Sequence, residues 1–261
     1  MPQAYVEPRR VSPLLSGTFR QRFEAKYRLN EFQAQAIRTC MAPFVVPDRL
    51  GGPRGDYPVN SLYLDSPDLR LFRGSKRGEK NRIKLRVRSY TQSPEDEAYL
   101  EIKRRVDQTI GKERADLPKM WLPHLFAGNS VAMSDAGIES PREREGFVHF
   151  RRLMESYQAR PFAFIRYDRE AYVGRMGDSV RITFDRRLCV RRCVAYQRGD
   201  WAEQRDWFSF FGDAVVLEIK FNNAFPRWVQ DLIIRFNLLR DSVSKYVLGV
   251  LALQQNGRLH G

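Results

Sequence analysis

Residues 81–90 read NRIKLRVRSY, and this stretch decides the fold. In a β-strand, successive side chains point to opposite faces, so every second residue shares a face. One face of this segment is apolar, and the other carries only cations: Arg82, Lys84, Arg86 and Arg88. Like charges that lie opposite each other in a sheet cost ~0.2–1 kcal/mol per pair. The row therefore predicts interleaved carboxylates or a bound anion.

The same alternation recurs elsewhere, and each occurrence predicts a strand with one charged face and one apolar face. The segments and their charged-face residues are RFEAKYRL at 22–29 (Glu24, Lys26, Arg28), AYLEIKRRV at 98–106 (Glu101, Lys103, Arg105), VRITFDRRLCV at 180–190 (Arg181, Thr183, Asp185, Arg187) and VVLEIKFN at 215–222 (Glu218, Lys220). VNSLYLD at 59–65 and AFIRYDREAYV at 163–173 also predict strands. Repetition of Glu-x-Lys on these faces places carboxylates among the cations.

Helical segments separate these strands. Asn30 is a candidate N-cap with Gln33 three residues later, before the helical spacing of 31–42. A short helix is expected to start at Ser66 and Pro67. The remaining expected helices cover 142–159, 226–240 and a segment that opens near residue 242, whereas 119–141 predicts a connection of lower order.

This order of elements predicts an α+β protein with a single main domain. Residues 1–18 are expected to form a loosely ordered arm, and residues 19–253 the domain. Two β-rich halves, about 19–118 and 160–222, are joined by a helical segment, and helices over 225–253 close the chain. If the strands form a closed antiparallel barrel with helices packed on its outside, the charged faces line a basic tunnel. The alternative is an open sheet whose charged face is merely solvated.

Composition favours an anionic partner. The 261 residues include 45 Lys and Arg against 31 Asp and Glu, a formal charge of +14. No stretch approaches the ~18 apolar residues that cross a bilayer, so a cytoplasmic protein is expected. The three cysteines at 40, 189 and 193 lack zinc-type spacing and are expected to be thiols.

Carboxylates on the charged faces either pair with arginines or hold a divalent cation. Histidines occur only at 124, 149 and 260, so a metal site would be oxygen-rich and would suit Mn²⁺ or Mg²⁺. Glu218 is the first candidate ligand, followed by Glu24 and Glu101. The sequence has no P-loop, GxGxxG, HExxH or GxSxG motif, so side chains would have to hold any triphosphate.

The ordered motifs across residues 19–250 resemble the VTC domain family. They are FEAKY at 23–27, SLYLDSPDL at 61–69, RIKLRVRSY at 82–90, LEIKRR at 100–105, YDREAY at 167–172, RITFD at 181–185, LEIKFN at 217–222 and SKYVLG at 244–249. That family belongs to the triphosphate tunnel metalloenzymes, and its eukaryotic members make inorganic polyphosphate from ATP with a divalent metal. The resemblance implies a closed barrel and a polyphosphate polymerase domain.

Carried over by position, the resemblance implies site residues. The main phosphate-handling residues are Lys26, Arg86, Arg88, Lys103, Arg169, Arg181 and Lys220. Further substrate-binding residues are Arg82, Lys84, Lys112, Arg166 and Lys245. The metal role falls on Glu218. Many members of the wider superfamily open with ExExK, but Arg22 occupies the first position here, so one possible metal ligand is missing.

The predicted activity is metal-dependent phosphoryl transfer on ATP or polyphosphate, with ATP and inorganic polyphosphate or triphosphate as partners. Synthesis of polyphosphate is the leading interpretation. A triphosphatase or polyphosphatase that uses water, and a non-catalytic polyphosphate-binding module, stay open. Nucleic acid is not expected, because the aromatics Phe23, Tyr27, Phe184 and Phe221 fall on the apolar strand faces.

Overall fold

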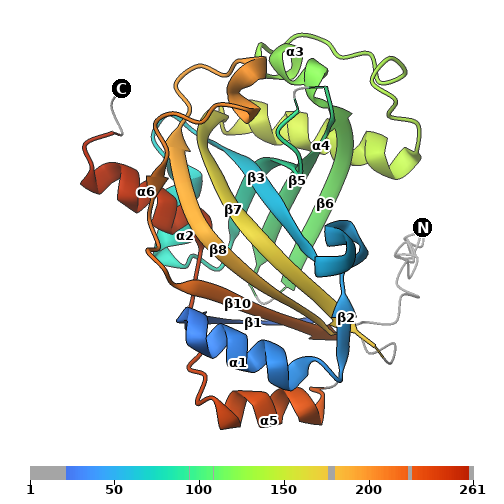
Figure 1. The fold of residues 1–261 in the computed structure, drawn as a ribbon. Helices are drawn as coiled ribbons and strands as arrows, with labels where there is room; N and C mark the ends of the chain where they lie inside the picture. Colours follow the sequence, from blue (N-terminus) through green and yellow to red (C-terminus); the bar gives the residue numbers. More distant parts are fainter. Residues whose placement is uncertain (1–21, 94, 108, 176–179, 223–224, 259–261) are drawn as a thin grey trace, which may run out of the picture.

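The structure is a computed structural model that describes residues 22–258 except 94, 108, 176–179 and 223–224. The arm predicted at 1–18 lies outside the described residues. One antiparallel sheet forms the centre of the molecule (Figure 1). Its strands are β1 (Arg22–Leu29), β2 (Val45–Pro47), β3 (Asp56–Asp65), β4 (Arg82–Ser89), β5 (Glu97–Val106), β6 (Thr109–Pro118), β7 (Arg160–Gly174), β8 (Arg181–Arg192), β9 (Phe208–Ser209) and β10 (Val215–Asn222).

The sheet is continuous but open. Its order is β1-β10-β8-β7-β3-β4-β5-β6, with β2 on β7 and β9 on β8, and no pairing of described strands joins β1 to β6. A closed barrel is therefore not shown, although the α+β class and the charged strand faces are. The physical reason lies at the edge of β1, where Tyr27 pairs with Arg240 and the Asp241 amide donates to the carbonyl of Lys26 (2.8 Å).

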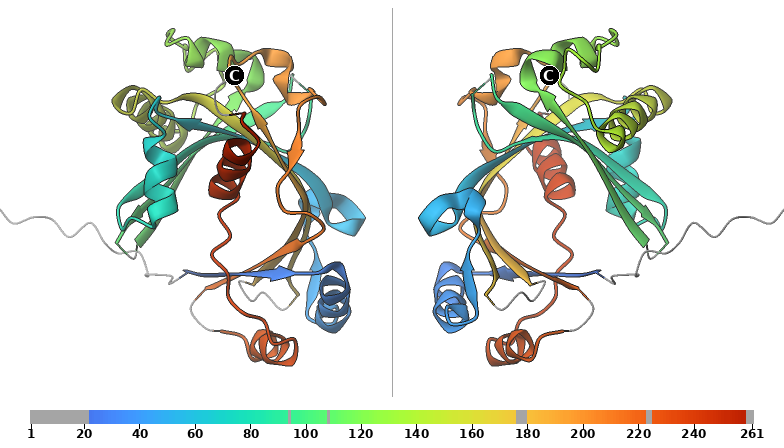
Figure 2. Two further views of the ribbon diagram at one scale, coloured as in Figure 1. Left: turned by 90° about the vertical axis from the view of Figure 1, so that its left-hand side faces the viewer. Right: turned by 90° about the vertical axis from the view of Figure 1, so that its right-hand side faces the viewer.

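The sheet bends into two limbs, with β4, β5 and β6 in one and β1 and β10 in the other (Figure 2). The chain between α5 (Arg227–Arg235) and α6 (Lys245–Gln255) runs between these limbs. Its residues contact both sides, because the Lys84 ammonium donates to Ser244 Oγ (2.9 Å) and the Lys26 ammonium to the carbonyl of Val243 (3.2 Å). The two limbs are therefore connected by side-chain contacts with this segment. In a closed barrel, hydrogen bonds between backbones of neighbouring strands would connect them instead.

Two helical layers cover the outer face of the sheet. Helices α3 (Leu122–Phe126) and α4 (Pro141–Ser156) supply Leu125, Phe147 and Phe150 to an apolar core over β3–β6. Helices α1 (Glu31–Met41) and α5 supply Ile37 and Val229 to a second core over β1, β8 and β10. The predicted capping box is present, since Asn30 Oδ1 accepts from the Gln33 amide (2.8 Å).

Helix α6 departs from the expectation that all helices pack outside. It lies on the sheet face that carries the charged residues, in a third core with β7 and β8. A Cβ at Gly249 would come within 3.1 Å of Ile165 Cδ1 and 3.2 Å of Val190 Cγ2, so glycine permits this close approach. The helix therefore fills one end of the space between the limbs, where Figure 2 shows it in red.

One predicted helix begins later than expected, and one strand was not predicted. Helix α2 (Arg70–Arg77) begins at Arg70 rather than at Ser66, because the side chains of Asp65 and Ser66 cap it from outside. Strand β6 was not predicted, since TIGKERADLP is rich in charge and contains Gly111; full-length pairing with β5 creates this strand. Within the described residues, no helix is long and apolar enough to span a bilayer.

Candidate functional site

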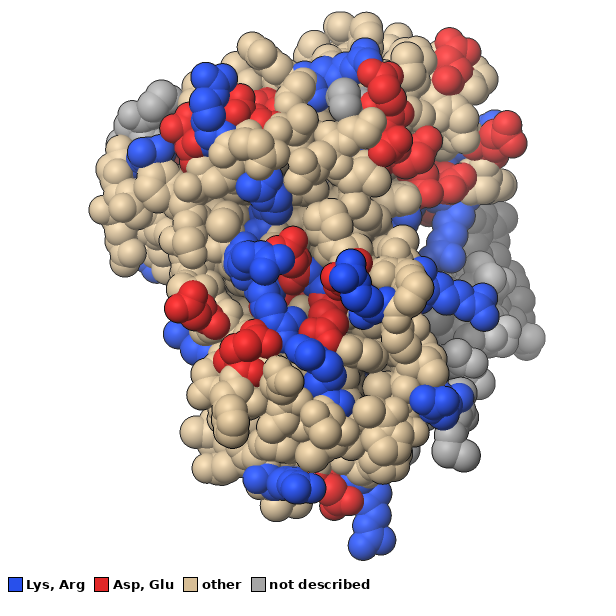
Figure 3. All heavy atoms as spheres, viewed as in Figure 1, with Lys and Arg blue, Asp and Glu red and all other residues tan. Residues whose placement is uncertain are grey.

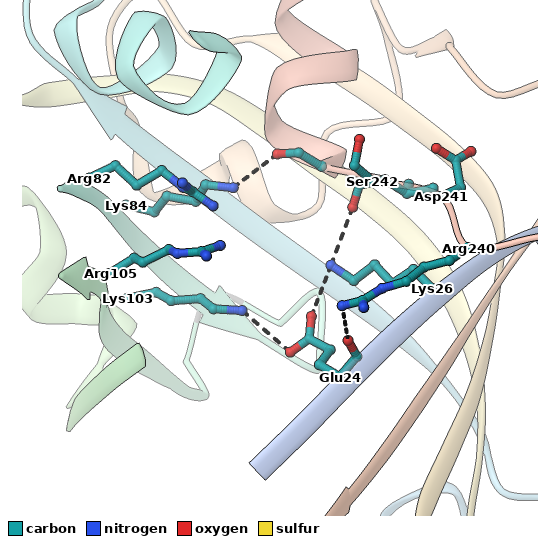
Figure 4. Close-up of a pocket in the computed structure, with 11 residues that line it drawn as sticks. Glu24, Lys26, Arg82, Lys84, Lys103, Arg105, Arg240, Asp241 and Ser242 are labelled. Atoms are coloured by element: carbon teal, nitrogen blue, oxygen red, sulfur yellow. Dashed lines mark hydrogen bonds and ion pairs between the residues drawn. The ribbon is translucent and has the colours of Figure 1, made fainter. Parts of the chain in front are cut away.

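A cavity of about 550 Å³ lies between the two limbs of the sheet (Figure 4). Strands β1, β4 and β5 and the segment before α6 line it. The lining residues are Glu24, Lys26, Arg82, Lys84, Lys103, Arg105, Arg240, Asp241, Ser242, Val243 and Ser244. In Figure 4 the cations of β4 and β5 point across the cavity toward Lys26, Glu24 and Arg240.

Strand register creates the cationic wall. Strands β4 and β5 place Arg82 opposite Arg105 and Lys84 opposite Lys103, so like charges face each other in two successive pairs. Further along the same strands, Arg86 lies opposite Glu101. The wall is thus neutralised at its inner end and remains positive toward the cavity.

Lys84 is the clearest sign of excess positive charge. Burial, followed by the neighbouring charges of Lys26 and Lys103, lowers its pKa to about 7. Its ammonium donates to Ser244 Oγ, and no carboxylate among the described residues lies within 4.0 Å of it. An anion in the cavity would supply the missing counter-charge.

The opposite wall mixes lysines and carboxylates from β1 and β10. Lys26 Nζ lies 3.0 Å from Glu24, and Lys220 forms an ion pair with Glu218. Glu24 also reaches Lys103 of β5 (3.6 Å), which bridges the two limbs. Burial opposes the charge of Glu218, but Lys220 and Lys26 outweigh it and hold the pKa of Glu218 well below its ordinary value.

Glu101 organises the inner end of the wall. Its carboxylate is fully buried and lies 2.7 Å from Arg86 Nε, 3.7 Å from Arg88 Nε and 2.8 Å from Lys112 Nζ. Burial raises its pKa, yet Arg86 and Arg88 reverse the shift and hold the pKa below its usual range. Arg86 also donates to the hydroxyl of Tyr63 (3.0 Å).

A second buried network lies where α6 begins. Arg169 of β7 forms a two-bond contact with Asp185 of β8 (2.7 and 2.8 Å), and Lys245 reaches the same carboxylate (2.7 Å). Lys245 also lies over the ring of Tyr167. The charges of Lys245 and Arg169 help to lower the pKa of Glu218, so this network adjoins the β1–β10 wall.

Two predicted site residues make their contacts outside the charged cluster described above. Arg181 lies beside Lys220 in the strand register but pairs with Asp48 (2.7 Å) and donates to Tyr57 (3.0 Å). Arg166 lies apart from the cluster, since it donates to Gln204 (3.0 Å) and stacks over Trp207. The other residues predicted to handle substrate or metal are brought together by the fold: Lys26, Arg82, Lys84, Arg86, Arg88, Lys103, Lys112, Arg169, Lys220, Lys245, Glu24, Glu101 and Glu218.

Six residues of the cavity lining were not predicted as site residues: Arg105 and the run 240–244. Arg105 lies on a strand face predicted to be charged, so alternation could have identified it. Arg240, Ser242 and Ser244 belong to the segment between α5 and α6, where no periodicity marks a contact with β1 or β4.

A divalent cation would find two carboxylates near each other, on β1 and β10. Burial and Glu218 raise the pKa of Glu24, while Lys26 and Lys103 lower it, so the two carboxylates interact. Mg²⁺ and Mn²⁺ are commonly held by one or two carboxylates together with substrate phosphates. Glu24 and Glu218 fit such a site, whereas the described residues contain no group of three His, Cys, Asp or Glu suited to a metal. Glu101 is already surrounded by three cations.

The outer face of the sheet provides a contrast. Figure 3 shows Lys and Arg next to Asp and Glu on that face rather than a patch of one sign. Arg186 pairs with Glu31 (2.7 Å) and Glu170 (2.8 Å), and Arg38 pairs with Glu170 (2.8 Å). These outer cations have carboxylate partners, whereas Arg82, Lys84 and Arg105 of the cavity wall have none among the described residues.

These features define an α+β domain whose curved antiparallel sheet carries a basic cavity on one face. Residues 18–254 match the model of the VTC domain, so the chain belongs to the VTC domain family. Its membership places the chain among domains related to polyphosphate and triphosphate tunnel enzymes.

Two solved structures have weaker similarity. One is a Vibrio parahaemolyticus protein provisionally described as an adenylate cyclase, with 12% identity, a TM-score of 0.43 and coverage of 87% of this chain and 96% of that one. The other is a Pyrococcus horikoshii protein, with 10% identity, a TM-score of 0.43 and coverage of 90% and 98%. Among curated proteins, no significant match is found.

Proposed function

We propose that this chain catalyses metal-dependent phosphoryl transfer on ATP and inorganic polyphosphate, with polyphosphate synthesis as its reaction. The observation that carries the proposal is the cationic wall of β4 and β5, in which Lys84 is buried beside other cations and has no carboxylate partner among the described residues. Membership of the VTC domain family supports phosphate chains as the matching anions.

Some residues of the site would bind phosphate directly, and others would orient those residues or shape the electrostatic environment. Lys26, Lys84 and Lys103 approach the cavity from both limbs and would neutralise phosphate oxygens. Arg86 and Arg88 would bind the inner end of the phosphate chain, while Glu101 fixes their direction. Arg169, Lys220 and Lys245 surround Glu218 and complete the electrostatic environment. Phosphoryl transfer needs positioning and charge stabilisation, so no protein nucleophile is required.

Glu24 and Glu218 are the residues that would hold a divalent cation. Such an ion, when bound, would neutralise charge on the phosphates and help to orient them. Lys26 and Lys220 keep both carboxylates ionised, because they lower the pKa of Glu24 and of Glu218.

The direct test incubates the purified protein with ATP and Mn²⁺, with and without a short polyphosphate primer. Gel electrophoresis would resolve chains, and a colorimetric assay would measure free phosphate. Longer chains with release of ADP would support synthesis. Free phosphate without chains would instead indicate a triphosphatase, and tight polyphosphate binding without turnover would indicate a binding module.

A further inference from the structure

Three arginines at the outer part of the cavity lack acidic partners among the described residues. Each donates to a backbone carbonyl: Arg82 to Glu79 (2.6 Å), Arg105 to Asp107 (2.8 Å) and Arg240 to Glu24 (3.1 Å). Burial lowers the pKa of Arg82, and the neighbouring charge of Arg105 lowers it further. Arg82 and Arg105 therefore lie close together, Arg240 faces them from the other side of the cavity, and all three keep donors that could bind an anion.

The arginines continue the cationic wall outward. Along β5 the cavity-facing residues are the buried Glu101, then Lys103, then Arg105, which lies next to the β5–β6 turn. Two residues of a strand span roughly 6.6 Å, so the wall from Glu101 to Arg105 covers roughly 13 Å. A single phosphate cannot contact both ends of such a wall, whereas an extended chain can.

We propose that Arg82, Arg105 and Arg240 form an outer subsite for phosphates of a chain that extends beyond the triphosphate-binding part of the cavity. The inference rests on the proposed function and adds a preference for polyphosphate over tripolyphosphate. Planar guanidinium groups suit it, because each can donate two hydrogen bonds to one phosphate. They reach the cavity from three separate segments: β4, β5 and the chain between α5 and α6.

The two acidic residues among the described residues that line the cavity, Glu24 and Asp241, are already engaged by other cations, and Glu24 pairs with Lys26 (3.0 Å) and Lys103 (3.6 Å). Asp241 lines the cavity, and its carboxylate lies 3.6 Å from Arg28 Nε on β1. In Figure 4 the Asp241 side chain lies apart from those of Arg82 and Arg105. The subsite thus keeps its net positive charge.

The test compares binding of tripolyphosphate with that of a longer polyphosphate by calorimetry. Variants are R105Q, R240Q and the double variant. R104Q is the matched control, because Arg104 precedes Arg105 on the same strand, is exposed and points to the opposite face. Arg240 pairs with Tyr27 through its backbone, so R240Q keeps that contact.

We expect the double variant to bind the longer chain about tenfold more weakly, as the loss of two partly exposed charged contacts implies. Its affinity for tripolyphosphate, and both affinities of R104Q, should stay near those of the wild type. Equal losses for both chains in the double variant, or an equal loss in R104Q, would overturn the subsite alone. If the wild type binds neither anion, the proposed function fails together with the subsite.

Discussion

The protonation of Lys84 should respond directly to a bound anion. Its pKa of about 7 results from burial first and from Lys26 and Lys103 second, so the free protein holds it partly neutral at neutral pH. A bound phosphate chain would favour the charged form and raise this pKa. At a pH near 8, binding of tripolyphosphate should therefore take up close to one proton at Lys84.

Calorimetry in two buffers with different ionisation enthalpies measures that proton uptake. The Lys84→Met variant should lose the uptake and bind tripolyphosphate about tenfold more weakly. Lys76→Met is a suitable control, because Lys76 lies on α2 outside the cavity lining. Unchanged proton uptake in Lys84→Met would show that another group titrates.

Glu218 and Arg86 should separate turnover from binding. Glu218 lies among Lys26, Lys220 and Arg169 as a candidate metal ligand, whereas Arg86 presents a cation held by Glu101. We expect Glu218→Ala to abolish metal-dependent turnover while changing tripolyphosphate affinity only a few-fold. Arg86→Ala should reduce both, with affinity lower by about tenfold or more. Turnover assays and calorimetry on the same preparations would check this, and equal binding losses would refute the division of roles.

At the scale of elements, strand alternation predicted which charged side chains share a sheet face, whereas Lys112, Arg169 and Lys245 were named only through the family resemblance. In β1, β4, β5 and β10 one sheet face is apolar and packed, so the period of two residues fixed which charges share the other face. Bulges limited this reasoning. Where the register between β7 and β8 shifts, Arg187 has a φ of 51° and pairs with Asp168, so it leaves the row of Arg181 and Asp185.

Packing over long distances explains what sequence patterns did not predict. Strand β6 exists because it pairs with β5, and α6 lies on the charged face because Gly249 admits the side chains of β7 and β8. Arg166 shares the basic character of its neighbours but points to Trp207. Charge alone could not distinguish it from Arg169, which lies three residues further along β7.

Helix α6 should depend on one hydroxyl group. Tyr246 stacks on Tyr63 (4.5 Å between ring centroids) and donates to Asp65 (2.5 Å), whose carboxylate also accepts from the amides of Leu71 and Phe72 at the start of α2. Tyr246→Phe keeps the ring and removes the donor. We expect it to lower the free energy of unfolding by about 1–3 kcal/mol, typical of a hydrogen bond to a buried charged group.

Urea unfolding would measure this loss, with Tyr90→Phe as the comparison, because Tyr90 packs edge-on against Tyr57 through its ring. The comparison variant should change stability by less than about 0.5 kcal/mol. If Tyr246→Phe changed the free energy of unfolding as little as the comparison variant does, the hydroxyl contact with Asp65 would not be what anchors α6 to α2.

At the scale of the molecule, the sheet is open, so a bound ligand can connect its two limbs and thereby stabilise the fold. The limbs meet through Glu24 and Lys103 and through contacts of Lys26 and Lys84 with the segment before α6. A phosphate chain that binds Lys26 and Lys84 together would connect β1 to β4. Tripolyphosphate should then stabilise the folded state, by about 2.7 kcal/mol at a concentration one hundred times its Kd.

For a chain of this length, that stabilisation corresponds to a rise in Tm of roughly 5–10 °C. Thermal unfolding monitored with increasing tripolyphosphate would measure it, and sodium chloride at matched ionic strength is the control, because it screens charges without bridging the limbs. Lys84→Met should show a smaller rise, whereas R104Q should match the wild type. Should sodium chloride raise Tm as much as tripolyphosphate does, general screening of the +14 charge would explain the effect, and a ligand that joins the limbs would not.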